Sequence, residues 1–185
     1  MGEMLRDNVR QIPIFGGLMD CSWQDHWESL GQTTVVLLLS TMPIWLGTII
    51  VYATGDIAGY AGFKASFYGT LAHGALFTYC TALLAPIFWI ALVDPPGARV
   101  FPSKVSHMVV IAIIDAIAAV FYGLVTAGKK LNEGFTFTLS TWVFFGSLML
   151  LYLGTVYHVH RMPDVPAEFK KQEDDFSSAY GEHRQ

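Results

Sequence analysis

Four long stretches that carry almost no charged side chain constrain this sequence more than any other feature. They cover residues 29–55, 65–93, 105–128 and 134–160, and Asp115 is the single Asp, Glu, Lys or Arg within them. Each stretch is longer than the roughly 20 residues that an α-helix needs to cross about 30 Å of hydrocarbon. The sequence therefore predicts an integral membrane protein with four transmembrane helices.

The composition agrees with a membrane protein and excludes several other classes. Hydrophobic residues make up 53% of the 185 positions and charged residues 14%, whereas about 25% of a typical soluble domain is charged. A net charge of −4 argues against a basic nucleic-acid-binding protein. Continuous apolar runs also differ from the alternating segments of about 10 residues in a transmembrane β-barrel. The expected fold class is all-α, an integral membrane four-helix bundle.

We expect three regions along the chain. Residues 1–31 are predicted to form a cytoplasmic or interfacial leader, residues 32–160 the transmembrane domain, and residues 161–185 a short cytoplasmic tail. The tail holds two prolines and a mixed-charge stretch, which do not suit a membrane span. The transmembrane helices are expected at residues 33–54, 66–93, 105–127 and 135–160.

A short helix at the membrane surface is expected near the end of the leader. Ser22, followed three residues later by Asp25, resembles the capping box that begins many helices. Trp23, Trp27 and Leu30 then recur at helical spacing and give this helix one aromatic face. Such a face suits a helix that lies in the headgroup layer before the first span.

The distribution of lysine and arginine predicts the orientation. With four spans, both termini and the loop over residues 93–105 share one side, which holds eight of the 11 basic residues. Lys64, Lys129 and Lys130 fall on the other side. Because cytoplasmic loops carry the excess of positive charge, we expect both termini in the cytoplasm and the protein in the cell inner membrane.

Small residues recur on one face of each of the last two spans. They are Ala112, Ala116, Ala119 and Gly123 in the third span, and Ser140, Ser147 and Gly154 in the fourth. Small residues let helices approach closely within a membrane. These stripes can pack within one bundle, or one of them can face another copy of the chain. Because four helices enclose little space, we expect a homo-oligomer.

Asp115 is the main candidate for a functional residue. It lies near the middle of the third span and beside the small-residue stripe. An ionised aspartate at that depth costs about 3 kcal/mol on insertion scales, so it should face protein rather than lipid. A neutral carboxyl bonded to a hydroxyl group and a carboxyl on an ion or proton path both fit this position.

Four histidines are the next candidates. His73, in the outer half of the second span, suits a pH sensor or ligand, although a neutral imidazole bonded to a backbone carbonyl is the simpler interpretation. His107 and His158 lie at the inner ends of their spans, where two facing histidines would ligate a haem. His158 and His160 would also suit a metal ion, but a polar flank at the membrane exit is simpler. We expect no cofactor and no metal ion.

No catalytic motif is visible. The sequence lacks HExxH, GxSxG, Walker A and CxxC patterns. No span carries the converging acids and bases that an intramembrane enzyme needs. Cys21 and Cys80 are too few for a disulfide framework and are expected to be reduced. The sequence therefore favours a function other than catalysis.

The tail is expected to dock on a cytoplasmic protein. Phe169 and Phe176 lie seven residues apart in a mixed-charge stretch that includes Lys170 and Lys171. That spacing places two apolar anchors on one face of a helix. The expected partners are thus the lipid bilayer, further copies of the chain and a cytoplasmic protein, without direct nucleic-acid contact.

In length, number of spans and short cytoplasmic ends, the chain resembles the small membrane subunits of bacterial anti-phage defence systems, such as the membrane subunit of Kiwa. The resemblance is one of architecture. It implies a homo-oligomeric membrane sensor or scaffold that recruits a soluble effector in antiviral defence. Two other functions remain open from the residues: an ion- or proton-conducting channel or transporter subunit that uses Asp115, and a haem-binding membrane redox subunit.

Overall fold

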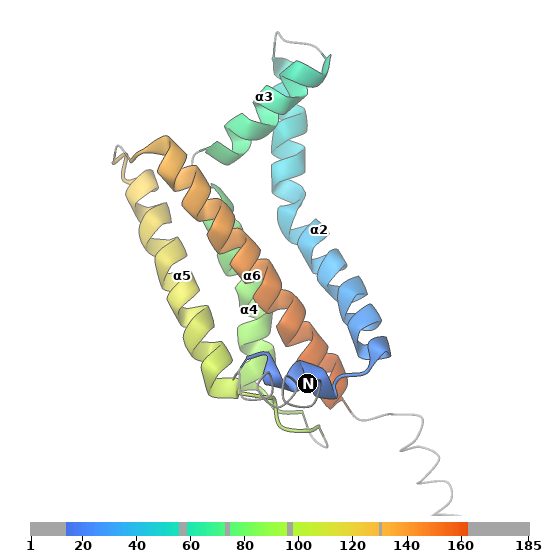
Figure 1. Cartoon of the computed structure of the whole chain (residues 1–185). Helices are drawn as coiled ribbons and strands as arrows, with labels where there is room; N and C mark the ends of the chain where they lie inside the picture. The colour runs from blue at the N-terminus through green and yellow to red at the C-terminus, as the bar shows by residue number, and fades with distance from the viewer. Residues whose placement is uncertain (1–13, 56–58, 73–74, 96–97, 130, 163–185) are drawn as a thin grey trace, which may run out of the picture.

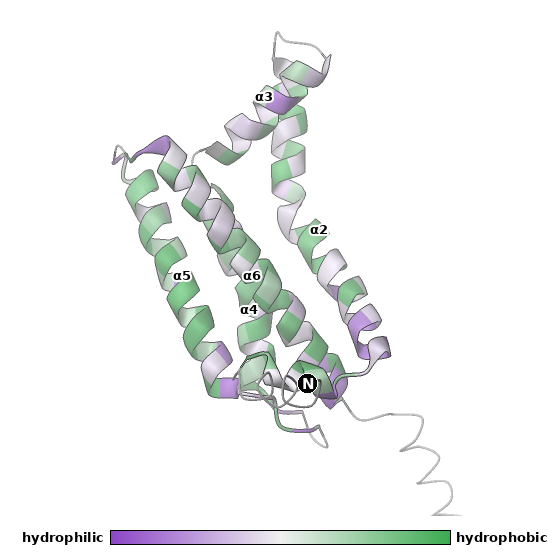
Figure 2. Ribbon diagram, in the orientation of Figure 1, coloured by the Kyte–Doolittle hydropathy of each residue, from purple (hydrophilic) through white to green (hydrophobic). Residues whose placement is uncertain are grey.

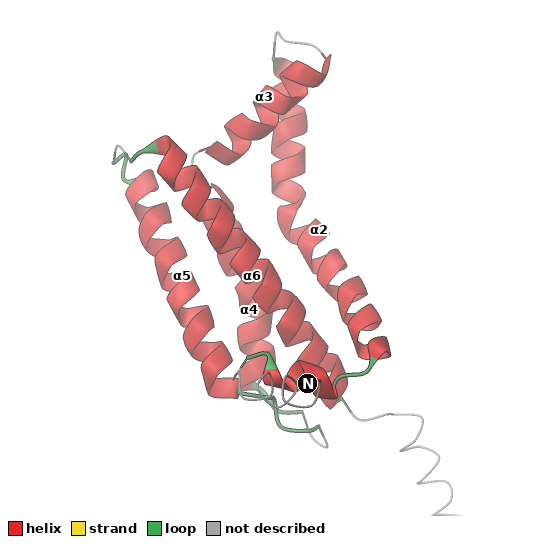
Figure 3. Cartoon of the chain, viewed as in Figure 1, coloured by secondary structure: helices red, strands yellow, loops and turns green. Residues whose placement is uncertain are grey.

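A computed structural model describes residues 14–55, 59–72, 75–95, 98–129 and 131–162, and this part of the chain is helical with short connections (Figure 1, Figure 3). In chain order the elements are a 3-10 helix, η1 (Gly16–Asp20), and the α-helices α2 (Trp23–Thr54), α3 (Gly59–Ala72), α4 (Ala75–Leu92), α5 (Lys104–Thr126) and α6 (Glu133–Arg161). The described residues contain no β-strand.

Four of these helices are long and apolar enough to cross a membrane, namely α2, α4, α5 and α6. Figure 2 shows hydrophobic residues along the lengths of α4, α5 and α6, with hydrophilic residues gathered near the ends of the bundle. The predicted all-α, four-span fold class is thereby confirmed. Helices α5 and α6 also begin and end within two residues of the predicted third and fourth spans.

Helix α2 is longer than the sequence indicated. Ser22 Oγ accepts a hydrogen bond from the backbone N–H of Asp25, and the Asp25 carboxylate accepts one from the backbone N–H of Ser22, so the predicted capping box is present. The helix then continues from Trp23 to Thr54 with Pro43 inside it. The expected interfacial helix and first span are therefore one element, with no break at the predicted boundary near residue 31.

The predicted second span, residues 66–93, is wrong as a single helix. The structure has α3 ending at Ala72 and α4 beginning at Ala75, and α3 turns back from the far end of α2 toward the bundle (Figure 1). The sequence between them is His73-Gly74. An apolar run does not mark where one helix ends and the next begins, so the sequence predicted a single span. Of the two described helices, α4 is the one long and apolar enough to cross a membrane.

Helices α4, α5 and α6 form the packed part of the molecule, and α2 leans on α6 (Figure 1). The largest cluster of buried side chains joins α4 to α5 and α6 through Leu83, Leu84, Ile87, Ile111 and Leu151. Helix α4 contacts each of the other α-helices. The other α-helices therefore all pack against α4.

The two described ends of the chain lie at the same end of the bundle. The hydroxyl of Tyr157, near the end of α6, donates a hydrogen bond to the carbonyl of Ile14. Tyr157 is fully buried against Phe101, which precedes α5. We call this region the N-terminal end of the bundle.

Candidate functional site

Asp115 and Thr81 form a polar pair in the middle of the membrane-crossing helices. Thr81 Oγ1 on α4 donates a hydrogen bond to Asp115 Oδ1 on α5, with 2.7 Å between the two oxygens. Asp115 is close to the middle of the 23 residues of α5. A hydroxyl group that donates to a carboxyl partly offsets the cost of placing the acid in hydrocarbon.

This pair lines a groove on the outer surface of the bundle rather than its interior. The groove has a volume of about 530 Å³ and runs between α4 and α5, with Asp115 and Thr81 flanked by Ala112, Ala116 and Ala119. The three alanines are exposed, and Asp115 is only partly buried. A carboxyl that faces outward at this depth meets lipid unless another protein surface covers it.

The two small-residue stripes face in different directions. In α5, Ala112, Ala116, Ala119 and Gly123 are exposed, and no atom would lie within 4 Å of a Cβ added at Gly123. The α5 stripe therefore lies on the surface of the described chain rather than in its core. It leaves a smooth surface beside Asp115.

The α6 stripe instead packs inside the bundle. Ser140 and Ser147 are fully buried, and a Cβ atom at Gly154 would lie 2.5 Å from Cγ2 of Ile87 on α4. Because glycine has no side chain, α4 and α6 can pack closely against each other at Gly154. Sequence periodicity identified both stripes but did not distinguish their directions.

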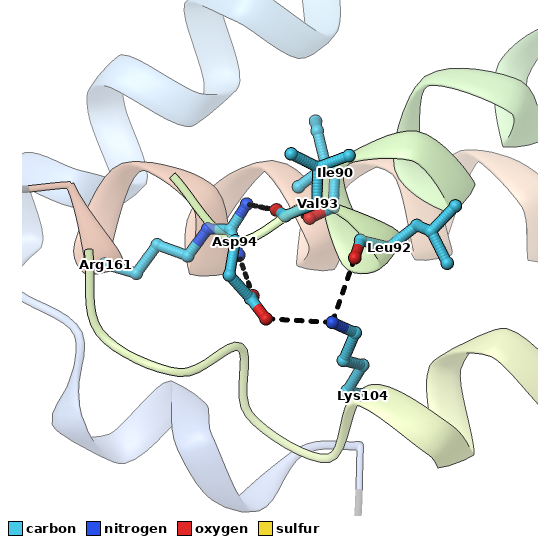
Figure 4. A network of polar contacts seen from close by, with 6 residues as sticks. All are labelled: Ile90, Leu92, Val93, Asp94, Lys104 and Arg161. Atoms are coloured by element: carbon cyan, nitrogen blue, oxygen red, sulfur yellow. Dashed lines mark hydrogen bonds and ion pairs between the residues drawn. The ribbon is translucent and has the colours of Figure 1, made fainter. Parts of the chain in front are cut away.

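A charged network holds the N-terminal end of the bundle together (Figure 4). The guanidinium of Arg161, at the end of α6, donates to Asp94 Oδ1 at 3.1 Å and to the carbonyls of Ile90 at 2.7 Å and Val93 at 3.0 Å. Arg161 is only 2% exposed. Its guanidinium also lies over the ring of Phe101, 5.4 Å from the ring centre.

Lys104 completes this network from the first turn of α5. Its ammonium donates to Asp94 Oδ2 at 2.9 Å and to the carbonyl of Leu92 at 3.0 Å. The two cations thereby satisfy carbonyl groups at the C-terminus of α4 and complement its dipole. The hydrogen bond from Lys104 and the positive charge of Arg161 hold the pKa of Asp94 below its usual value.

The two histidines considered for haem ligation each have one buried ring nitrogen without a hydrogen-bond partner. His107 is fully buried, and its ring packs edge-to-face against Phe101 and Tyr157, with ring centres 5.1 and 5.4 Å away. Its Nε2 has no hydrogen-bond partner and no exposed surface. His158 Nδ1 is buried in the same way. Haem ligation by these two histidines stays a prediction from the sequence.

A second contact joins the start of α2 to the end of α6. His160 Nδ1 lies 2.9 Å from Asp25 Oδ2, although 135 residues separate them in the chain. Cys21 lies beside this pair, and burial together with Asp25 and Asp20 raises the pKa of its thiol to about 11. From the sequence, Asp25 was expected in a helix cap and His160 in a polar flank. Neither pattern indicates a contact between residues so far apart in the chain.

Five of the predicted functional residues lie outside the described part of the chain. They are His73 in the second apolar stretch, and Phe169, Lys170, Lys171 and Phe176 in the tail. Their assignments remain predictions. A comparison of the chain with protein-family models, with curated proteins and with solved structures found no match.

Proposed function

We propose that the protein is a self-associating scaffold or sensor of the cell inner membrane, in which copies pack together through the α4–α5 groove. The polar pair formed by Thr81 and Asp115 carries this proposal, because it lies on an outer surface at the depth of the hydrocarbon. A second copy seated on the groove would remove the carboxyl from lipid. The chain's own described helices leave that surface open.

The surface around the pair suits contact with another helix. Ala112, Ala116, Ala119 and Gly123 present little side-chain volume along α5, so a partner helix can approach closely and gain van der Waals contact along its length. Hydrogen bonds between membrane helices contribute about 0.6 kcal/mol on average. Asp115 would add such bonds while the small residues supply the close packing.

The N-terminal end of the bundle supports the second half of the proposal, the recruitment of a cytoplasmic protein. The excess of lysine and arginine on this side supports a cytoplasmic location. The network of Arg161, Asp94 and Lys104 holds α4, α5 and α6 in fixed relation there. A rigid end of the bundle suits the docking of a cytoplasmic protein. The architectural resemblance to anti-phage subunits makes phage infection the first condition under which to look for a partner.

The test of self-association is a substitution that fills the groove without changing the bundle. Ala116→Leu places a larger side chain on the exposed stripe, and Ala53→Leu makes the same change at an exposed position of α2. We expect Ala116→Leu to weaken association in mild detergent by at least about tenfold, which corresponds to about 1.4 kcal/mol. Ala53→Leu should retain the oligomer. A wild-type protein that is monomeric in both detergent and bilayers would contradict the proposal.

One observation favours a second candidate function, an ion- or proton-conducting oligomer. Asp115 and Thr81 form a polar layer at mid-membrane, and intramembrane acids commonly mark ion or proton paths. Proton and cation flux into liposomes separates the two functions. Flux that is lost in Asp115→Asn, with the oligomer intact, would replace the scaffold with a channel; absence of flux from the wild-type oligomer would remove the channel.

A further inference from the structure

Three side chains of metal-binding type meet at the N-terminal end of the bundle. Cys21 follows η1, Asp25 lies in the first turn of α2, and His160 lies in the last turn of α6. Their ligand atoms, a thiol sulfur, a carboxylate oxygen and an imidazole nitrogen, all lie within 4.8 Å of one another. Two distant parts of the chain thus contribute to one cluster.

The local structure holds each of these side chains in place. The backbone N–H of Ser22 donates to Asp25 Oδ2 at 2.8 Å, which fixes the carboxylate over the start of α2. The same oxygen lies 2.9 Å from His160 Nδ1. Cys21 Sγ lies 3.4 Å from the carbonyl of Gly17. The cluster is therefore built by the capping box and the end of α6 together.

The cluster is also accessible to an ion from water. The side chains of Asp25 and His160 are 18% and 21% exposed, and Cys21 is half-buried. Asp25 and Asp20 lie near enough to the thiol to act on it electrostatically. Their negative charge attracts a cation to the position between the three ligand atoms.

We propose that Cys21, Asp25 and His160 form a binding site for a divalent transition-metal ion, with Zn²⁺ as the best match. Thiolate, imidazole and carboxylate are the three ligand types that proteins use for zinc. Calcium and magnesium prefer oxygen ligands alone, so a thiol and an imidazole argue against them. Three protein ligands leave one tetrahedral position for water or for a residue of a partner protein.

The distances require only small movements on binding. Ligand atoms around a tetrahedral zinc ion lie roughly 3.3–3.8 Å apart, given bond lengths of about 2.0–2.3 Å. The contact of 2.9 Å between Asp25 and His160 would open by less than an ångström, and the sulfur already lies within 4.8 Å of both atoms. Rotations of the side chains about their own bonds supply shifts of this size.

A bound ion would fasten the start of α2 to the end of α6. That link would tie the N-terminal segment to the bundle at the side we assign to the cytoplasm, where thiols stay reduced and a metal rather than a disulfide is the expected cross-link. The site lies at the end of the bundle, away from the α4–α5 groove. It therefore does not depend on self-association.

The test uses the full-length protein, purified in detergent, stripped with a chelator and titrated with Zn²⁺ and Co²⁺. We expect one ion per chain and a sulfur-to-cobalt charge-transfer band. Cys21→Ser should abolish this band, and His160→Gln and Asp25→Asn should each weaken Zn²⁺ binding by at least about tenfold. Cys80→Ser is the matched control, because Cys80 is fully buried in α4, away from the three ligands, and its sulfur donates to the carbonyl of Leu76 at 3.1 Å.

Two readouts keep this test independent of folding and of the proposed function. Circular dichroism should show equal helix content in all variants, and Ala116→Leu should bind Zn²⁺ as the wild type does. Absence of stoichiometric binding by folded wild-type protein would overturn the site. So would a sulfur-to-cobalt band that persists in Cys21→Ser or disappears in Cys80→Ser.

Discussion

Gly154 on α6 lies so close to Ile87 on α4 that a Cβ atom added to the glycine would meet Cγ2 of the isoleucine at 2.5 Å. Ile87 is fully buried and β-branched, so its side chain has no free space and few rotamers available. This contact sets the separation of the two helices in this part of the bundle.

Gly154→Ala should therefore destabilise the bundle by about 1–3 kcal/mol, the usual cost of an extra group in a well-packed core. Gly146→Ala on the same helix is the control, because its Cβ would meet Ile114 Cδ1 at an ordinary 3.9 Å. Unfolding in mixed detergent micelles measures the free energy of unfolding of both variants. Equal stability of the two variants would show that α4 and α6 are not in close contact at Gly154.

The hydrogen bond from Thr81 to Asp115 predicts a measurable coupling between α4 and α5. A double-mutant cycle with Thr81→Val and Asp115→Ala should give a coupling energy of about 0.6–1.7 kcal/mol, the range found for hydrogen bonds between membrane helices. Asp115→Asn should retain most of the stability, since the amide oxygen still accepts the bond. Additive effects of Thr81→Val and Asp115→Ala would mean that the bond does not form.

The lowered pKa of Asp94 predicts that the folded protein loses stability in acid. Lys104 and Arg161 lower the pKa of Asp94 in the folded protein, whereas its unfolded value is about 3.9. The stabilisation is present in full above the unfolded pKa and is lost as the pH falls through the lower folded pKa. Asp94→Asn should remove this part of the pH dependence, which lies below about pH 5. Identical acid unfolding of wild type and variant would contradict the network.

Arg161 should be far less tolerant of change than an exposed arginine on the same side. It is 2% exposed and bonds to Asp94 and two carbonyls, so Arg161→Met removes several charge-assisted bonds at once. We expect a loss of about 2–4 kcal/mol in the free energy of unfolding. Arg99→Met, at an exposed position, should change it by less than about 0.5 kcal/mol.

The sequence predicted the spans well where an apolar run coincided with one helix. The third span, expected at residues 105–127, is α5 at Lys104–Thr126, because hydropathy alone marks both of its ends. The prediction of the second span failed for residues 66–93, where one apolar run covers two helices. Hydropathy does not report a change of direction within such a run.

The candidate sites were harder to predict because they depend on contacts between distant residues. Periodicity placed Ala116 and Gly154 on small-residue faces but could not show that one faces outward and the other meets Ile87. The cluster of Cys21 and His160 forms only after α2 and α6 pack together. Neither residue belongs to a local metal-binding pattern.

If copies of the chain meet through the α4–α5 groove, a cysteine scan along α5 in native membranes should detect the contact. In a background without Cys21 and Cys80, single cysteines from residue 112 to 123 are oxidised and the cross-linked dimer is measured. Cross-linking should peak at Ala112, Ala116, Ala119 and Gly123, which are exposed, and be lowest at the buried Ala118. A pattern without this periodicity, or no cross-linking at any position, would contradict the account.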